Sequence, residues 1–171
     1  ADAVEEYDVW WLEDPVPPEN HDVQEEVTKS TSTTICAGEN VYRKHGLRRL
    51  IERQGLDVIQ PDMPKFGGMR ETVKTAEAAD SYYIPMALHN VSTPLGTIAG
   101  AHVAAAARTF LAIEYHSREL EWWSDIVNEP VIEDGRIRVP DEPGLGVTLD
   151  RDVVGANLLG DATLFDPAPD E

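Results

Sequence analysis

Five short apolar segments, each ending in a carboxylate or a histidine, recur at nearly even spacing between residues 10 and 114. Their last residues are Glu13, Glu39, Asp62, His89 and Glu114, which lie 26, 23, 27 and 25 residues apart. Each interval is about the length of one strand plus one crossover helix. The segments are nearly continuous in apolar character, which is typical of parallel strands buried on both faces. The sequence therefore predicts five strand–helix units.

The connecting helices can be located from local signals. Thr93 is a predicted N-cap with Pro94 in the first helical position, so a helix rich in small residues is expected over 95–107. Other helices are expected over 22–31, around 47–51 and over 70–81. In such folds the active site lies at the carboxyl ends of the strands, where the loops are free to vary. We therefore expect the five ionisable residues to face one another across a single opening.

The net charge of the chain argues against some classes of binding partner and indicates the environment in which the protein works. The 171 residues include 32 acidic and 14 basic side chains, which gives a net charge of -18. Such a charge argues against nucleic acids and anionic membranes as partners, because both are negative. The acids are scattered and lysine is scarce, which we interpret as adaptation to high salt. An ordinary acidic cytosolic protein is the alternative.

Cysteine usage and hydropathy favour a cytoplasmic location. Cys36 is the single cysteine and lies in an apolar segment, so the chain forms no internal disulfide and is expected in a reducing compartment. No apolar stretch is long enough to cross a bilayer, and the first residues do not resemble a signal peptide. We therefore expect no membrane partner.

Carboxylates at neighbouring strand ends are typical of a magnesium site. Mg²⁺ prefers oxygen ligands in near-octahedral geometry, and Glu13 and Glu39 are the predicted ligands. Taken singly, each would be read as a solvated or helix-capping carboxylate; their repetition at strand ends favours metal binding. His89 is a candidate general base because imidazole exchanges protons near neutral pH. Asp62, one strand earlier, could orient that imidazole, and a purely structural histidine is the alternative.

Four motifs in this order resemble the enolase superfamily, in its mandelate racemase subgroup: Trp11-Leu-Glu-Asp-Pro15, Ala37-Gly-Glu-Asn40, Gln60-Pro-Asp-Met-Pro-Lys-Phe-Gly-Gly68 and Leu88-His-Asn90. The resemblance implies that Glu13 and Glu39 match the second and third magnesium ligands, on the fourth and fifth barrel strands. Asp62 and His89 match an Asp–His dyad on the sixth and seventh strands. Glu114, on the eighth, matches an acid that hydrogen-bonds the substrate carboxylate as it becomes an enediolate.

The resemblance also implies parts that these residues do not supply. They are the first three barrel strands, the aspartate that is the first metal ligand, and an N-terminal capping domain. A complete (β/α)8 barrel has eight strands in about 250 residues. We therefore expect an α/β fold that forms the C-terminal part, about strands 4–8, of a TIM-type barrel. The chain is expected to need a complementary N-terminal polypeptide of the same enzyme, and to form a homo-oligomer.

After Glu114 the pattern changes. A helix is expected over 118–127 and a hairpin over 132–139, with Asp134-Gly135 at its turn. The chain is accordingly divided into a partial barrel over residues 1–127 and a C-terminal extension over residues 128–171. The resemblance implies that this extension returns toward the capping domain.

The motif contexts within the subgroup point to a reaction. Ala87-Leu-His-Asn90 and the Trp122-Trp123 region are most similar to acid-sugar dehydratases that act on gluconate, galactonate or xylonate. The expected activity is magnesium-dependent dehydration of a sugar acid to a 2-keto-3-deoxy acid through an enediolate. A racemase or epimerase of a 2-hydroxy acid, which uses the same proton abstraction, is one alternative. A non-catalytic scaffold that kept the fold is another.

Overall fold

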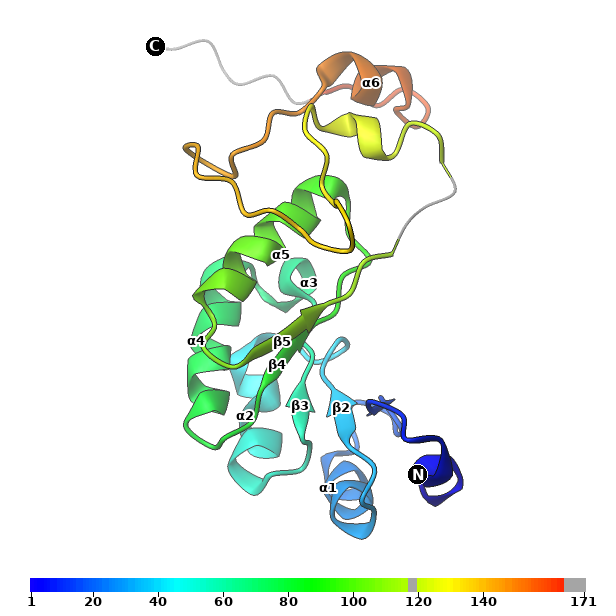
Figure 1. Ribbon diagram of the computed structural model, residues 1–171, viewed down its shortest axis with the longest axis vertical. Coiled ribbons are helices and arrows are strands. Elements are labelled where there is room, and N and C mark those ends of the chain that lie inside the picture. Colours follow the sequence, from blue (N-terminus) through cyan, green and yellow to red (C-terminus); the bar gives the residue numbers. More distant parts are fainter. Residues whose placement is uncertain (117–119, 165–171) are drawn as a thin grey trace.

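Five parallel strands form the centre of the computed structural model, which describes residues 1–116 and 120–164 (Figure 1). Their order in the sheet is β1-β2-β3-β4-β5, the same as in the chain, and every neighbouring pair is parallel. The strands are β1 (Leu12–Glu13), β2 (Ile35–Ala37), β3 (Val58–Ile59), β4 (Met86–Leu88) and β5 (Phe110–Ile113). The prediction of five parallel strands at these positions is confirmed.

A helix follows each of the first four strands. The 3-10 helix η1 (Asp2–Tyr7) precedes β1, and the helices after the strands are α1 (His21–Ser30), α2 (Arg43–Arg53), α3 (Met63–Phe66), α4 (Met69–Asp80) and α5 (Pro94–Ala106). Thr93 caps α5 as expected, because its hydroxyl accepts a hydrogen bond from the backbone N–H of Gly96. Helix α1 begins one residue before the expected range of 22–31, and its cap is Asn20.

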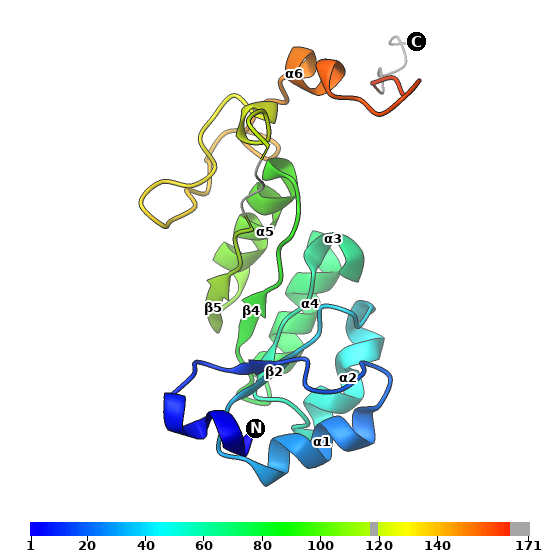
Figure 2. The same ribbon diagram turned by 90° about the vertical axis from the view of Figure 1, so that its right-hand side faces the viewer.

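Helices α2, α4 and α5 cover one face of the sheet, as Figures 1 and 2 show. The main core lies between this helical layer and the strands, and its members include Leu47, Leu50, Ile59, Met86 and Leu88. Alternate residues of the strands point to the opposite face, where Cys36, Val58 and Ala87 form a small cluster with Trp11. Side chains therefore alternate between the two faces with the period of two that strands impose.

The sheet has two open edges among the described residues, at β1 and at β5. Apolar side chains near both edges reach solvent: Trp10 is 64 % exposed and Leu111 is 40 % exposed. A closed barrel has no strand edges. The fold is therefore a partial barrel, in agreement with the predicted fold class. No helix in residues 1–116 and 120–164 is long and apolar enough to cross a membrane.

The segment after β5 packs on the end of α5 through a second cluster formed by Ile98, Ile126, Val127 and Val131 (Figure 2). The helix predicted over 118–127 is wrong in its described part, where only the 3-10 helix η2 (Ser124–Ile126) forms; residues 117–119 lie outside the described residues. The short helix α6 (Arg151–Ala156) follows.

The expected turn at Asp134-Gly135 forms, but its hairpin is minimal. Both residues have positive φ, as a type I′ turn requires. Glu133 and Arg136 pair through two backbone hydrogen bonds of 2.9 Å, and no longer strand extends from them in the described chain. The division of the chain after residue 127 stays a prediction.

Candidate active site

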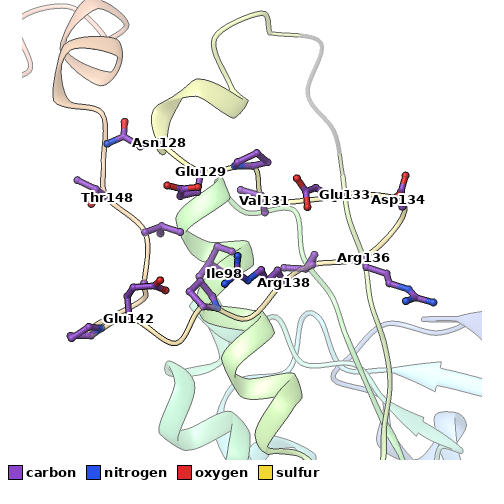
Figure 3. Close-up of a pocket in the computed structure, with 16 residues that line it drawn as sticks. Ile98, Asn128, Glu129, Val131, Glu133, Asp134, Arg136, Arg138, Glu142 and Thr148 are labelled. Carbon is purple, nitrogen blue, oxygen red and sulfur yellow. The ribbon is translucent and has the colours of Figure 1, made fainter.

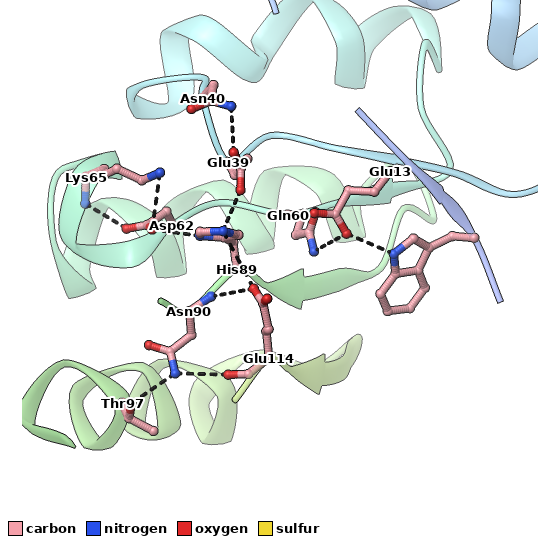
Figure 4. A network of polar contacts seen from close by, with 11 residues as sticks. Glu13, Glu39, Asn40, Gln60, Asp62, Lys65, His89, Asn90, Thr97 and Glu114 are labelled. Atoms are coloured by element: carbon pink, nitrogen blue, oxygen red, sulfur yellow. Dashed lines mark hydrogen bonds and ion pairs between the residues drawn. The ribbon is translucent and has the colours of Figure 1, made fainter. Parts of the chain in front are cut away.

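The carboxyl ends of the five strands carry Glu13, Glu39, Asp62, His89 and Glu114. Figure 4 shows these side chains gathered at one end of the sheet, from neighbouring strands. Four of them are joined directly, because Asp62, Glu39 and Glu114 all approach the imidazole of His89. Glu13 lies beside this group and is held by other partners.

Asp62 and His89 form a buried pair at the centre of the site. Nδ1 of His89 lies 2.7 Å from Oδ2 of Asp62, and the exposed fractions of the two residues are 8 % and 5 %. The other oxygen of Asp62, Oδ1, accepts the backbone N–H of Lys65 at 3.1 Å and so caps α3. The ammonium of Lys65 lies 3.4 Å from Oδ2. Asp62 is thus fixed on both oxygens, and it fixes the ring of His89.

The second ring nitrogen of His89 faces two carboxylates. Nε2 lies 2.5 Å from Oε2 of Glu39 and 3.6 Å from Oε2 of Glu114. The backbone N–H of Asn90 donates to the same oxygen of Glu114 at 3.2 Å. The Asn90 side chain donates to the backbone carbonyl of Glu114 and to the hydroxyl of Thr97, both at 2.9 Å (Figure 4). Asn90, which follows β4, is therefore hydrogen-bonded to Glu114, which follows β5, and this fixes the two strand ends relative to each other.

Glu13 receives two hydrogen bonds on one oxygen. The indole Nε1 of Trp11 donates to Oε2 at 3.2 Å, and the amide Nε2 of Gln60 donates to the same atom at 2.9 Å. Trp11 precedes Glu13 by two positions and Gln60 precedes Asp62 by two positions, so each lies on the same face of its strand as the predicted site residue. Trp11, Gln60 and Asn90 were not predicted as site residues, although this period of two would have pointed to the first two.

The loops after β1 and β2 are joined next to Glu13 and Glu39. Asp14 has a φ of 40°, and its Oδ1 accepts the backbone N–H of Gly38 at 3.3 Å. The pKa of Asp14 is raised above its ordinary value, mainly by burial. The charges of Glu39 and Glu13 add to the rise, and the hydrogen bond from Gly38 opposes it. Gly38 has a φ of 140°, and an added Cβ would meet the backbone of Gln60 at 3.1 Å. Glycine is therefore required where β2 approaches β3.

These residues fit part of the ligand set of a divalent cation. Glu13 and Glu39 offer the oxygen ligands that Mg²⁺ prefers, at the ends of adjacent strands. Both hydrogen bonds on Glu13 end on Oε2 in the described structure, which leaves Oε1 for a ligand. No three His, Cys, Asp or Glu side chains within the described ranges come close enough to hold a metal among themselves. A complete site would need a further ligand.

A large cavity lies away from the strand ends. It measures about 1040 Å³ and is formed by Ile98 of α5 and the segment from Asn128 to Thr148 (Figure 3). Its charged lining mixes both signs, with residues such as Glu133 and Arg136. None of the five strand-end residues lines it, so we place the active site at the strand ends instead.

Comparison with known proteins decides the family. Residues 1–153 match the family described as enolase C-terminal domain-like. The chain belongs to this family. The resemblance to the enolase superfamily, drawn from four short motifs, is thereby confirmed.

Individual relatives agree with this membership. D-xylonate dehydratase of Haloferax volcanii is 60 % identical over 167 residues, which cover 97 % of this chain and 40 % of that protein. D-galactonate dehydratase of Ralstonia pickettii is 30 % identical, with 88 % and 41 % covered. The crystal structure of a mandelate racemase/muconate lactonizing enzyme-like protein from Rubrobacter xylanophilus superposes with a TM-score of 0.85 at 46 % identity, and covers 88 % of this chain and 39 % of that one. The chain thus spans about 40 % of the length of the curated relatives that it matches.

Proposed function

We propose that this chain carries the proton-transfer residues and two magnesium ligands of a sugar-acid dehydratase. The observation that carries the proposal is the buried contact of 2.7 Å between Asp62 and His89, with Glu39 and Glu114 facing the other ring nitrogen. The proposal is supported by the similarity to D-xylonate dehydratase and D-galactonate dehydratase. The product would be a 2-keto-3-deoxy acid, formed through an enediolate.

The role of His89 follows from the acidity of its substrate. A proton on the carbon next to a carboxylate is very weakly acidic, so an imidazole alone removes it slowly. General-base catalysis contributes about 10²–10⁴-fold, and stabilisation of the enediolate must supply the rest. Asp62 holds Nδ1 of His89, so proton transfer takes place at Nε2. This nitrogen either removes the α-proton or protonates the leaving hydroxyl.

The negative charge of the enediolate needs partners. A divalent cation held by Glu13 and Glu39 would act as a Lewis acid on the substrate carboxylate. Glu114, 3.6 Å from Nε2 of His89, can donate a hydrogen bond to the same charge when its carboxyl is protonated. Its backbone and side chain are held by Asn90, which keeps the carboxyl next to His89.

We further propose that the chain works together with a polypeptide that supplies three more strands and the remaining aspartate ligand. The open edges at β1 and β5 and the exposure of Trp10 and Leu111 support this, because such edges are normally paired or covered. We call this chain together with the complementary polypeptide the barrel-complete protein. Activity, substrate and metal binding are proposed for it.

A racemase or epimerase is the second candidate, favoured by the likeness to the mandelate racemase-like structure from Rubrobacter xylanophilus. The barrel-complete protein should be incubated in D₂O with xylonate, galactonate and gluconate, and the products analysed by NMR. We expect a 2-keto-3-deoxy acid from at least one substrate. Deuterium exchange with inverted configuration and no keto acid would favour the racemase. No exchange and no product with any of them would contradict both.

A further inference from the structure

Gln60 is a buried amide that is only half satisfied. It follows β3 directly and is 3 % exposed. Its Nε2 donates to Oε2 of Glu13 at 2.9 Å, whereas its Oε1 is buried without a hydrogen-bond partner among the described residues. The orientation of the amide is set by chemistry, because an ionised carboxylate only accepts hydrogen bonds and must face the NH₂ group.

Such a residue is a poor choice for stability alone. A buried acceptor without a partner costs free energy, and an apolar side chain of the same size would avoid that cost. The surroundings would accept one, since Trp11, Cys36, Val58 and Ala87 form an apolar cluster on this face of the sheet. We therefore explain the presence of an amide at this position by the hydrogen bond that its NH₂ group donates to Glu13.

Gln60 and Trp11 together restrain one oxygen of Glu13 from two directions. Trp11 approaches Oε2 along β1 and Gln60 approaches it from the end of β3, two strands away. When one oxygen of a carboxylate accepts two hydrogen bonds in this way, the position of its other oxygen is also fixed. Residues that hydrogen-bond a metal ligand in this manner set its orientation and hence the metal affinity.

We propose that Gln60 is a positioning residue of the metal site: it holds Oε2 of Glu13 so that Oε1 faces the divalent cation. The inference rests on the proposed function, which assigns Glu13 as a ligand. The unpaired carbonyl of Gln60 is the cost of placing the amide there.

The test replaces Gln60 by methionine, which has similar size and no strong hydrogen-bonding group. Mg²⁺ affinity of the barrel-complete protein is measured by calorimetric titration, and the melting temperature is measured without metal. We expect Gln60→Met to raise the Kd for Mg²⁺ by about 10–100-fold. The metal-free melting temperature should stay the same or rise, because the unpaired carbonyl is removed with the amide.

Gln24 provides a matched control. It is also buried, at 4 % exposure, and one atom of its amide, here Nε2 rather than Oε1, lacks a partner in the described part of the chain, but it lies on α1. Gln24→Met should leave the Kd for Mg²⁺ unchanged. If Gln60→Met does not fold, Gln60→Asn takes its place, because it keeps an amide that is one methylene too short to reach Glu13.

The outcomes separate this inference from the function on which it rests. An unchanged Kd in the Gln60 variant, with a raised Kd in Glu13→Gln, overturns the positioning role and leaves the proposed metal ligand in place. An unchanged Kd in both overturns the role of Gln60 and the assignment of Glu13 together. A raised Kd in both, with Gln24→Met unaffected, supports the inference.

Discussion

Nδ1 of His89 lies 2.7 Å from Oδ2 of Asp62, and the backbones of the same two residues form a parallel bridge beyond the ends of β3 and β4. The backbone pairing fixes how far apart the two side chains begin, so the contact is built into the sheet. Asp62 also caps α3 with its other oxygen. The imidazole is therefore oriented by a carboxylate that the fold itself holds still.

Asp62→Asn should slow dehydration by the barrel-complete protein about 10²–10⁴-fold, the range of general acid–base catalysis. An amide can turn its NH₂ group to Nδ1, which would place the ring proton on Nε2, the atom that must exchange protons. The measurement is kcat with its pH profile. Asp57→Asn is the control, because Asp57 accepts the backbone N–H of Ile35 at 2.8 Å at the opposite end of β3. Equal kcat values for the Asp62 variant and the unmodified protein would contradict the role of Asp62.

Glu13→Gln and Glu39→Gln should each weaken Mg²⁺ binding by the barrel-complete protein at least tenfold. Each change removes a charged oxygen ligand and leaves a weaker, neutral one. Calorimetric titration gives the Kd. Glu52→Gln is a suitable control, since Glu52 lies in the last turn of α2 and pairs there with Arg48, a surface contact that involves neither ligand. Unchanged affinity in both ligand variants would remove the metal site from these strand ends.

The melting temperature of the barrel-complete protein should rise with salt concentration. The net charge of -18 makes the folded chain repel itself, and the screening length falls from about 10 Å at 0.1 M to about 3 Å at 1 M ionic strength. The measurement is a thermal melt across this range of KCl concentration. A melting temperature that does not change with KCl would favour the alternative of an ordinary acidic protein.

Glu5 should add stability that is lost in acid. Its Oε1 accepts hydrogen bonds from the hydroxyl and the backbone N–H of Ser32, at 2.7 and 3.2 Å. These bonds lower the pKa of Glu5 from its ordinary value of 4.5. The contribution of Glu5 to the free energy of unfolding is therefore fully present above pH 4.5, and it is lost as the pH falls through the lowered pKa. Glu5→Gln should flatten this part of the stability curve in urea melts at several pH values; an unchanged slope would count against the interaction.

The sequence was most informative where periodicity and local chemistry coincide. The five strands and the strand-end residues from Glu13 to Glu114 follow from regular spacing, and Thr93 with Pro94 marks α5 through capping rules. The hydrogen bond from Gln60 to Glu13 joins residues that are two strands and 47 residues apart, and no local pattern reports which partner a side chain will choose. Between residues 120 and 164 the sequence has few apolar repeats from which elements can be predicted, and the packing of Ile126, Val127 and Val131 on Ile98 is a contact between distant residues that no local pattern reports.

The central claim is that His89 transfers the proton in the dehydration of a sugar acid. The most direct measurement is the rate of 2-keto-3-deoxy acid formation from D-xylonate by the barrel-complete protein and its His89→Asn variant, at saturating Mg²⁺. We expect keto acid from the unmodified protein, and a rate about 10²–10⁴-fold lower in the variant, with its far-UV circular dichroism spectrum unchanged as evidence of folding. Equal rates of keto acid formation in the two proteins would contradict the account.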